Sequence, residues 1–408
     1  MAGTNNIRVV KPADDAGKRK QKRRSREPRL IIPSQGMDHV FLVIVAVLLA
    51  FGILMMFSAS YMEGLLESGN DGYKYLRVQA TSAAIGGVIM IFLSMIDYHL
   101  FLNSKVVLLG YLAVVVLLSY TTLRGVGQAE AIRWIRIGSY NFQPSEVAKP
   151  VLIVVLSFLA VRSGGEYKIG RFSIKGVPML IAMAPICVNM VFQRHISGLL
   201  IMCAIFACVV VMSGISWRDI VAMGLVLGLA AIVMIFVFSL TRENGLSYIL
   251  TRLSSMSSTD DGQLTDENWQ VMQSLIAMGS GGWFGLGLGA SRQKYLWLPE
   301  AQNDFIIPII VEELGYIGGI AVVILFVLFM IRGFRIAKTA PDKFGTLIVT
   351  GIVFQIGFQA ILNIGVACNA FPNTGVSLPF FSYGGSALLV QLAEMGVVLS
   401  VSRQCTDI

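Results

Sequence analysis

Charged residues are scarce in this sequence. Only 14% of the 408 residues are Asp, Glu, Lys or Arg, whereas 55% are hydrophobic and the mean hydropathy is +0.72. Soluble domains seldom combine so little charge with so much apolar sequence. The composition therefore excludes an ordinary soluble enzyme. Hydrophobic runs recur along almost the whole chain and predict a polytopic membrane protein.

Cysteine and histidine are also rare, and their spacing excludes two common kinds of site. The five cysteines include no CxxC pair, so the sequence supports neither a disulfide framework nor a zinc site. The three histidines, His39, His99 and His195, are too scattered for a metal triad. The glycines at 285–289 lack both the strand-then-helix context of a dinucleotide fingerprint and the Lys-Ser/Thr of a P-loop. A nucleotide-binding loop is therefore excluded.

Ten apolar runs are candidate transmembrane helices. They lie at about residues 39–58, 79–96, 105–121, 147–162, 178–193, 198–213, 218–240, 305–331, 344–366 and 385–402. Long uninterrupted runs satisfy their backbone in hydrocarbon as helices rather than as a barrel. The predicted fold class is therefore an all-α polytopic membrane protein with about ten transmembrane helices. No cleavable signal is expected, because the first run begins nearly forty residues in and is too long.

Basic residues predict the orientation of these helices. Ten Lys or Arg residues lie between Arg8 and Arg29, within a tail (1–36) that we expect to be cytoplasmic and disordered. Two further basic loops are expected on the same side by the positive-inside rule. They carry Arg162, Lys168, Arg171, Lys175, Arg332, Arg335, Lys338 and Lys343. Both termini, including the short segment 404–408, are then cytoplasmic, and the connections at 59–78, 122–146, 241–304 and 367–384 face outward.

The basic tail has two interpretations. It acts as a topology determinant that also touches anionic lipid or a cytoplasmic partner, or it binds nucleic acid. No aromatic or glycine-rich nucleic-acid module accompanies it, so the first interpretation is favoured and no nucleic-acid partner is expected.

Several ionisable residues interrupt the apolar runs, although burying charge in a membrane is costly. They are Glu146, Lys149, Arg194, His195, Glu312 and Glu313. Glu146 and Lys149 are three apart, so one helix face can hold both. A structural ion-pair network is one interpretation of each, but the whole set favours a polar cavity inside the bundle. The proline- and glycine-rich connection "NAFPNTGVSLPFFSYGGSA" is expected to fold back into the mouth of that cavity.

The large connection between the seventh and eighth helices (241–304) ends in the stretch "GSGGWFGLGLGASRQKYLWLPEAQNDF". Glycine-rich backbone can approach a ligand closely, and its amides can meet a phosphate. Tight helix packing and a re-entrant turn explain the same glycines.

Three long motifs resemble those of the SEDS family (shape, elongation, division and sporulation). They are "AIRWIRIGSYNFQPSEVAKP", "WQVMQSLIAMGSGGWFGLGLGASRQKYLWLPEAQNDFIIPIIVEELGYIGG" and "PNTGVSLPFFSYGGSALL", and "MMFSASY" fits as well. They occur in the family's order, and the resemblance covers residues 37–403, the predicted transmembrane glycosyltransferase domain. Details of the motifs favour the cell-division type, with the sporulation type left open.

The resemblance implies a peptidoglycan glycosyltransferase, an inverting hexosyltransferase that polymerises lipid II at the outer face of the bacterial cytoplasmic membrane, at the division septum. It also implies a class B penicillin-binding protein and other divisome membrane proteins as partners. Two alternatives remain open: a transporter that flips lipid II, and a non-catalytic scaffold. No cofactor is certain, although a divalent cation, Mg or Mn, is possible.

The resemblance also suggests site residues. Asp261 is the expected base, with Asp260 second and Asp266 third, because the segment "RLSSMSSTDDGQLTDENWQ" departs from the family pattern. Asp304 corresponds to the aspartate of the family's H-T-D-F motif, although Gln302 and Asn303 replace its first two residues. The expected substrate-binding residues are Arg133, Arg136, Glu146, Lys149, Gln273, Ser274, Lys294, Glu300, Ser382, Gly384 and Gly385. Charge sign makes Arg133, Arg136, Lys149, Arg194 and Lys294 candidates for the pyrophosphate. His195 replaces a carboxylate of the family's usual pattern.

Overall fold

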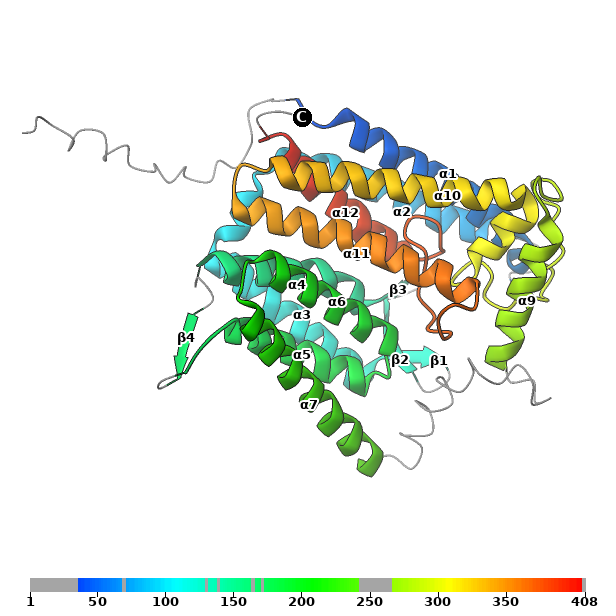
Figure 1. The fold of residues 1–408 in the computed structure, drawn as a ribbon. Helices are drawn as coiled ribbons and strands as arrows, with labels where there is room; N and C mark the ends of the chain where they lie inside the picture. Colours follow the sequence, from blue (N-terminus) through cyan, green and yellow to red (C-terminus); the bar gives the residue numbers. More distant parts are fainter. Residues whose placement is uncertain are drawn as a thin grey trace, which may run out of the picture.

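The structure is a computed structural model in which the chain forms a bundle of long helices (Figure 1). It describes residues 36–67, 71–128, 131–137, 140–162, 166–169, 172–241 and 266–405. The predicted basic tail, except for its last residue, and residues 242–265 of the predicted large loop lie outside these ranges.

Each of the ten apolar runs coincides with a helix. These helices are α1 (His39–Glu67), α2 (Lys74–Met95), α3 (Ser104–Arg124), α4 (Pro144–Arg162), α5 (Val177–Phe192), α6 (Ile196–Met212), α7 (Trp217–Thr241), α10 (Ile306–Thr339), α11 (Lys343–Ala367) and α12 (Gly385–Ser402). Among the described residues, seven helices are long and apolar enough to cross a membrane, and α5 and α6 are shorter apolar helices. The helical membrane class is confirmed, and the count of ten crossings stays a prediction.

Short elements occupy the connections between these helices. They are α9 (Asp266–Gly281), the 3-10 helix η2 (Tyr98–Leu102), and the strands β1 (Val126–Gln128), β2 (Ala131–Ile137), β3 (Tyr140–Phe142), β4 (Glu166–Ile169) and β5 (Phe172–Lys175). The first three strands form an antiparallel sheet in chain order, and β4 pairs with β5. The strands were not predicted. β2 is rich in isoleucine, and two residues separate it from β3, which suits a tight hairpin.

The centre of the bundle is formed by α11, α4 and α12. In the most apolar window of each helix, 78% of α11, 67% of α4 and 61% of α12 is buried, against at most 33% for α1, α2, α3 and α10. α11 packs against α10, α4 and α6, and α12 packs against α2. Polar side chains on α4 and α11 therefore lie inside the protein rather than toward lipid.

The two ends of the bundle differ. α9, the sheet β1–β3 and the connection 368–384 lie at one end, called here the α9 end (Figure 1). β4 and the C-terminus lie at the opposite end. The predicted topology makes the α9 end extracytoplasmic, and this orientation stays a prediction.

A histidine between two carboxylates ties connections together at the opposite end. His99 Nδ1 lies 2.6 Å from Asp97 Oδ1, and His99 Nε2 lies 3.1 Å from Asp342 Oδ2. Burial alone lowers the pKa of His99, but the hydrogen bonds to Asp342 and Asp97 outweigh it and raise that pKa. Burial also acts to raise the pKa of both carboxyls, yet hydrogen bonds, those of His99 among them, hold each pKa below its ordinary value. His99 therefore joins the α2–α3 and α10–α11 connections, and the two carboxylates favour its protonated form.

Candidate active site

The candidate bases differ in how far the structure defines them. Asp260 and Asp261 lie outside the described residues. Asp266 is the first residue of α9. Asp304 is the candidate carboxylate whose surroundings are described, so the site is built from it.

Asp304 stands directly before α10, at the α9 end. Its backbone oxygen accepts a hydrogen bond of 2.7 Å from Asn363 Nδ2, and the same amide donates 2.6 Å to the Val376 oxygen. A Cβ added at Gly375 would lie 3.0 Å from Asp304 Oδ2, so the carboxylate rests against the 368–384 connection. Glu300, a predicted substrate contact, is exposed and accepts from the Asp304 amide through its backbone oxygen. One amide of α11 thus fixes the half-buried Asp304 and the connection together.

A row of amides on α11 was missed by the sequence analysis. Gln355, Gln359 and Asn363 are spaced four apart and are all buried, so they share one helix face. Gln359 Nε2 donates 3.0 Å to the Ser377 oxygen, and its Oε1 accepts 3.0 Å from Lys149 Nζ. Three amides at four-residue intervals in an apolar run were the available signal, because unpaired amides are costly at membrane depth.

Glu146 and Lys149 lie on one face of α4, as their spacing predicts, and form an ion pair. Lys149 Nζ lies 2.8 Å from Glu146 Oε2, and both side chains are buried. Because Lys149 also binds Gln359, the ion pair is connected through α11 to Ser377. This set, called here the α4–α11 network, reaches the same connection that contacts Asp304.

Three predicted substrate contacts, Ser382, Gly384 and Gly385, lie at the end of the 368–384 connection and hold its backbone in place. Leu378 N donates 2.7 Å to Ser382 Oγ, and Gln79 Nε2 donates 3.1 Å to the Ser382 oxygen. Gly384 N in turn donates 3.2 Å to Gln79 Oε1. A Cβ at Gly385 would lie 2.7 Å from Ser82 Oγ of α2. The connection does fold back into the bundle, and these residues position it.

The predicted cations of β2 and of the turn before α6 also lie at the α9 end. Arg133 Nη2 donates 3.0 Å to the Arg194 backbone oxygen, which joins β2 to the turn before α6. Arg194 and His195 are buried, and Arg194 has a φ of 53°. Arg136 is exposed. Buried positive charge therefore gathers where α6 begins.

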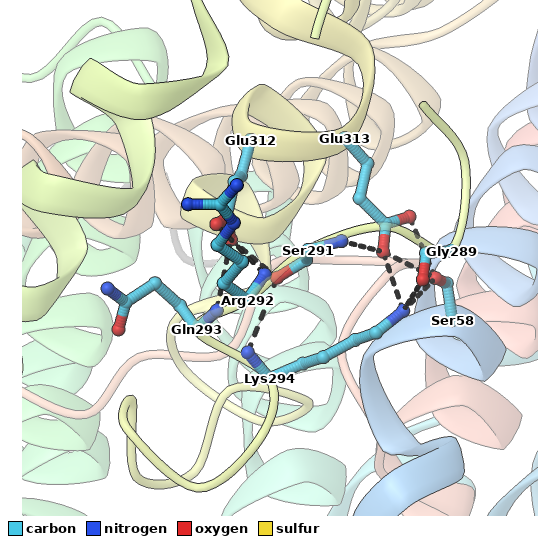
Figure 2. Close-up of polar contacts among 8 residues, drawn as sticks. All are labelled: Ser58, Gly289, Ser291, Arg292, Gln293, Lys294, Glu312 and Glu313. Carbon is cyan, nitrogen blue, oxygen red and sulfur yellow. Dashed lines mark hydrogen bonds and ion pairs between the residues drawn. The ribbon is translucent and has the colours of Figure 1, made fainter. Parts of the chain in front are cut away.

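The glutamates of α10 form a second network with α1 and the glycine-rich stretch. Lys294 Nζ lies 2.9 Å from Glu313 Oε1, and Ser58 Oγ of α1 donates to both oxygens of Glu313 at 2.8 and 2.7 Å. Ser291 Oγ donates to Glu312, whose Oε1 also accepts 3.0 Å from Arg292 N (Figure 2). Lys294 was predicted to contact the pyrophosphate, but its ammonium is engaged here. We call this set the loop clamp.

The glycine-rich stretch closes on α10 through its backbone. Leu286 N donates 2.9 Å to the Glu312 oxygen, and Tyr316 N donates 2.9 Å to the Gly282 oxygen. α10 is broken at Gly315, with φ 72° and ψ −175°, where a Cβ would lie 2.2 Å from the Trp283 oxygen. Of the two interpretations of the glycine-rich stretch, tight packing describes Gly281 and Gly285, where an added Cβ would lie 2.1 Å from a backbone oxygen of α10. The buried charges lie in two networks on different helices, and the polar cavity inside the bundle stays a prediction.

α9 packs against the end of α11. Ser274 Oγ donates 2.8 Å to the Ala367 oxygen, and Gln273 is buried beside it. Asn373 Nδ2 donates 2.9 Å to Gln270 Oε1. The start of α9, which follows the segment carrying Asp260 and Asp261, is therefore fixed to the connection that contacts Asp304.

The side-chain oxygens near Asp304 are metal ligands of the kind that a hard cation prefers, rather than a soft one. The described residues include no group of three His, Cys, Asp or Glu side chains able to hold a metal ion. Asn363 Oδ1 and Thr374 Oγ1 are buried, and neither has a hydrogen-bond partner among the described residues. One carboxylate with neutral oxygens fits Mg²⁺, which is commonly held by one or two carboxylates and substrate phosphates.

Comparisons with known proteins extend these observations. A "Probable peptidoglycan glycosyltransferase FtsW" from Geobacter sp. (strain M18) is 32% identical over 91% of this chain and 98% of that protein. "Stage V sporulation protein E" of Bacillus subtilis (strain 168) is 34% identical over 90% of this chain and 97% of that protein.

Solved structures share the fold. A chain from a peptidoglycan synthase complex aligns with a TM-score of 0.69 at 23% identity, over 91% of this chain and 99% of that chain. The rod shape determining protein RodA of Thermus thermophilus aligns with a TM-score of 0.63 at 25% identity and the same coverage. The family model described as "Cell cycle protein" matches residues 38–407. This chain is thus an integral membrane protein that belongs to the FtsW/RodA/SpoVE family.

Proposed function

We propose that this protein is a peptidoglycan glycosyltransferase that polymerises lipid II into glycan strands during cell division. Curated relatives that match about nine tenths of the chain carry this activity in their names. The observation that carries the proposal is the attachment of Asp304 and the start of α9 to one connection, at one end of a membrane bundle. Asp304 is thereby held at the end of the bundle, where a lipid-linked sugar presents its head group.

The reaction needs a base and positive charge. A sugar hydroxyl of one substrate attacks the anomeric carbon of the other, and a new C–O bond forms. The bond from that carbon to the phosphate oxygen breaks, and its electron pair leaves with the polyprenyl diphosphate. The hydroxyl proton passes to a carboxylate, for which Asp261 is proposed and Asp260 is second. Cations stabilise the diphosphate as its charge develops.

Asp304 has a supporting role in this proposal. Its carboxylate lies at the edge of the 368–384 connection, and it orients the base or a substrate hydroxyl. If a divalent cation takes part, Asp304, Asn363 and Thr374 are the residues that hold it with the substrate phosphates, and it neutralises phosphate charge.

The setting of the enzyme follows from the proposed topology. The α9 end faces outward from the bacterial cytoplasmic membrane, both termini are cytoplasmic, and residues 37–403 form the catalytic domain. A class B penicillin-binding protein and other division proteins are the proposed partners at the septum. A structural neighbour of this chain belongs to a peptidoglycan synthase complex, which supports a partner of this kind.

Polymerisation by purified components tests the proposal. The full chain, co-purified with a class B penicillin-binding protein, is incubated with labelled lipid II, and the glycan products are separated by length. The wild type is expected to make polymer, and Asp261→Ala is expected to stop it without loss of folded protein. Asp304→Ala is expected to slow it by about 10²-fold, the usual effect of one general acid–base or electrostatic group.

Asp71→Ala is the matched control, since Asp71 lies in the α1–α2 connection, where its carboxylate accepts from Arg77 and from the Tyr73 amide. Polymer yield with this variant is expected to equal that of the wild type. If Asp260→Ala is inactive and Asp261→Ala is active, the base is Asp260 rather than Asp261. If the protein moves lipid II across liposomes but makes no polymer, it is a transporter rather than an enzyme. If it activates the partner but makes no polymer, it is a scaffold.

A further inference from the structure

The start of α1, the end of α10 and the end of α12 meet at the opposite end of the bundle from α9 (Figure 1). A cavity of about 380 Å³ lies between them, far from the candidate active site. Its lining residues come from all three segments. They include Met37, Asp38, His39, Val40, Arg332 and Cys405. Because His39 and Val40 are exposed, the cavity is open to the surroundings of the protein.

One wall of the cavity is a salt bridge that leaves donors unused. Arg332 Nε lies 2.7 Å from Asp38 Oδ2, and Asp38 Oδ1 accepts 2.9 Å from Phe41 N. Asp38 is buried, whereas the Arg332 side chain is 19% exposed. Among the described residues Arg332 makes no other hydrogen bond, although a guanidinium carries five N–H donors. The remaining donors of Arg332 are therefore free for a ligand in the cavity.

A second arginine reaches the same cavity from the end of α12. Arg403 Nη2 lies 3.9 Å from Met37 Sδ, a weak contact with a residue that lines the cavity. Arg403 Nε is buried and has no hydrogen-bond partner within the described part of the chain. A buried donor left unpaired is costly, and it calls for an explanation such as a ligand. Two guanidinium groups with unused donors therefore flank one cavity.

The charge around this cavity is positive. Asp38 balances Arg332, but no salt bridge in the described ranges joins Arg403 to a carboxylate. Arg335 is exposed and lies three residues after Arg332, so the two are neighbours on the surface of α10. Guanidinium groups bind phosphate oxygens through parallel hydrogen bonds. The cavity therefore suits a phosphate group.

Apolar side chains lead away from the cavity along α1 and α10. Each helix has a row of exposed residues spaced three or four apart, so each row occupies one face. The rows are Val40, Val43 and Val47 on α1, and Ile324, Leu328 and Ile331 on α10. Val40 lines the cavity, and Ile331 is next to Arg332. A soluble phosphate would contact the arginines alone, whereas a phospholipid would also cover these rows with its acyl chains.

We propose that this cavity binds the phosphate of an anionic phospholipid between Arg332 and Arg403, with the acyl chains against the exposed rows of α1 and α10. The phosphate oxygens accept from the donors that the Asp38–Arg332 salt bridge leaves unused, so the bridge stays intact. The proposed topology places the lipid in the cytoplasmic leaflet. The bound lipid joins the start of α1 to the ends of α10 and α12.

Lipid binding to the purified full chain tests this site. Wild type and Arg403→Gln are freed of lipid in detergent and titrated with phosphatidylglycerol, phosphatidylcholine or inorganic phosphate. Native mass spectrometry counts the bound molecules. Arg403→Gln is expected to bind phosphatidylglycerol about fivefold more weakly at the tightest site, which is the usual contribution of one arginine beside an anionic lipid surface.

A second variant separates the guanidinium from the total charge of the protein. Asp38→Asn/Arg332→Gln removes both members of the salt bridge and leaves the net charge unchanged. Replacing both members of a buried pair is commonly tolerated by a fold. This variant is also expected to bind phosphatidylglycerol about fivefold more weakly, because the second guanidinium is lost. Wild-type affinity in both this variant and Arg403→Gln would overturn the site.

Arg218→Gln is the matched control, because it removes the same charge as Arg403→Gln. Arg218 is exposed near the start of α7 and does not line the cavity. It lies at the same end of the bundle, five residues after Ser213, whose backbone oxygen accepts from Lys343 at the start of α11. The control is expected to keep wild-type affinity. A loss equal to that of Arg403→Gln would show a general charge effect and contradict a defined site.

The three ligands separate the sources of the phosphate group. A loss confined to phosphatidylglycerol supports an anionic phospholipid, whereas an equal loss for phosphatidylcholine contradicts the selection for negative charge. If inorganic phosphate binds as tightly as phosphatidylglycerol and is lost in the same variants, the site holds a soluble phosphate and the lipid is wrong.

The proposed function fails separately from this site. If the wild type binds phosphatidylglycerol through both arginines yet makes no polymer, the lipid site stands and the polymerase falls. If the wild type polymerises lipid II and both cavity variants bind phosphatidylglycerol normally, the polymerase stands and the lipid site falls.

Discussion

The loop clamp and the α4–α11 network each contain a buried lysine–glutamate pair, and the two differ in what surrounds the pair. Lys294 lies 2.9 Å from Glu313, and Lys149 lies 2.8 Å from Glu146. In the loop clamp both oxygens of Glu313 accept further bonds from Ser58. In the α4–α11 network the pair continues through Gln359 into the 368–384 connection.

The difference predicts a structural use of buried charge in the loop clamp and a functional one in the α4–α11 network. A carboxylate saturated by donors of its own protein has little capacity left for a ligand. The loop clamp therefore fixes the glycine-rich stretch against α10 and α1. In the α4–α11 network, Lys149 lies one helical turn after Ser145, whose hydroxyl has no hydrogen-bond partner among the described residues. The network also reaches the 368–384 connection, which contacts Asp304. Substrate contact is expected there.

Breaking the loop clamp is expected to have the largest effect on stability. Glu313→Ala leaves the Lys294 ammonium buried without its carboxylate, which typically costs about 3–5 kcal/mol. Thermal unfolding in detergent measures the change. The double variant Glu313→Gln/Lys294→Met removes both charges and is expected to recover most of the loss. An unchanged unfolding temperature for Glu313→Ala would show that the clamp contributes nothing.

Neutralising the α4–α11 pair is expected to affect polymerisation more than stability. Glu146→Gln/Lys149→Met removes both charges at similar volume, which a fold commonly tolerates. The rate of glycan formation is expected to fall about 10²-fold, because charge near the leaving group is lost. Initial rates and unfolding temperatures are compared for the same preparation. A normal rate with a large fall in unfolding temperature would make this network structural as well.

A substitution at Gly315, where α10 is broken, tests the backbone contacts between the glycine-rich stretch and α10. Gly315→Ala is expected to cost about 1–3 kcal/mol, because alanine is strained at positive φ and its Cβ would meet the Trp283 oxygen. Gly110→Ala in α3 is the control, since nothing lies within 4 Å of an added Cβ there. Alanine is the better helix former, so this variant is expected to match or exceed the wild type. Equal stability of the two variants would contradict the strained close contact.

The histidine cluster at the opposite end is expected to give the smallest effect, and one that depends on pH. The pKa of His99 is raised in the fold, so its stabilisation is complete below the unfolded value of about 6.5 and is lost as pH rises through the folded pKa. The pKa values of Asp97 and Asp342 are lowered, so their contribution is present above about 3.9 and is lost as pH falls through the folded values.

The unfolding temperature of His99→Gln is compared with that of the wild type at about pH 6 and about pH 9. The variant is expected to be destabilised at the lower pH and to approach the wild type at the higher one. A constant difference across this range would mean that the charge of His99 contributes nothing. The loop clamp, which contains no histidine, is expected to show no such dependence.

Much of the fold follows from local features of the chain. Each apolar run of suitable length became a helix because hydrocarbon leaves the backbone no other way to satisfy its hydrogen bonds. The three-residue spacing of Glu146 and Lys149 was enough to predict that one helix face holds both, and the structure pairs them. The strand β2 was missed because seven residues in a connection give a weak signal beside long apolar runs.

The sequence by itself determined that this is a helical membrane protein with buried charges in its spans, because run length and composition are local quantities. The tertiary structure alone decided which charge meets which partner. Ser58 and Glu313 are 255 residues apart, yet they share a hydrogen bond of 2.8 Å. Such a contact depends on how two helices are rotated and on the path of the chain between them. For that reason Lys294 and Lys149, both named as candidates for the pyrophosphate by charge sign, have different surroundings in the fold.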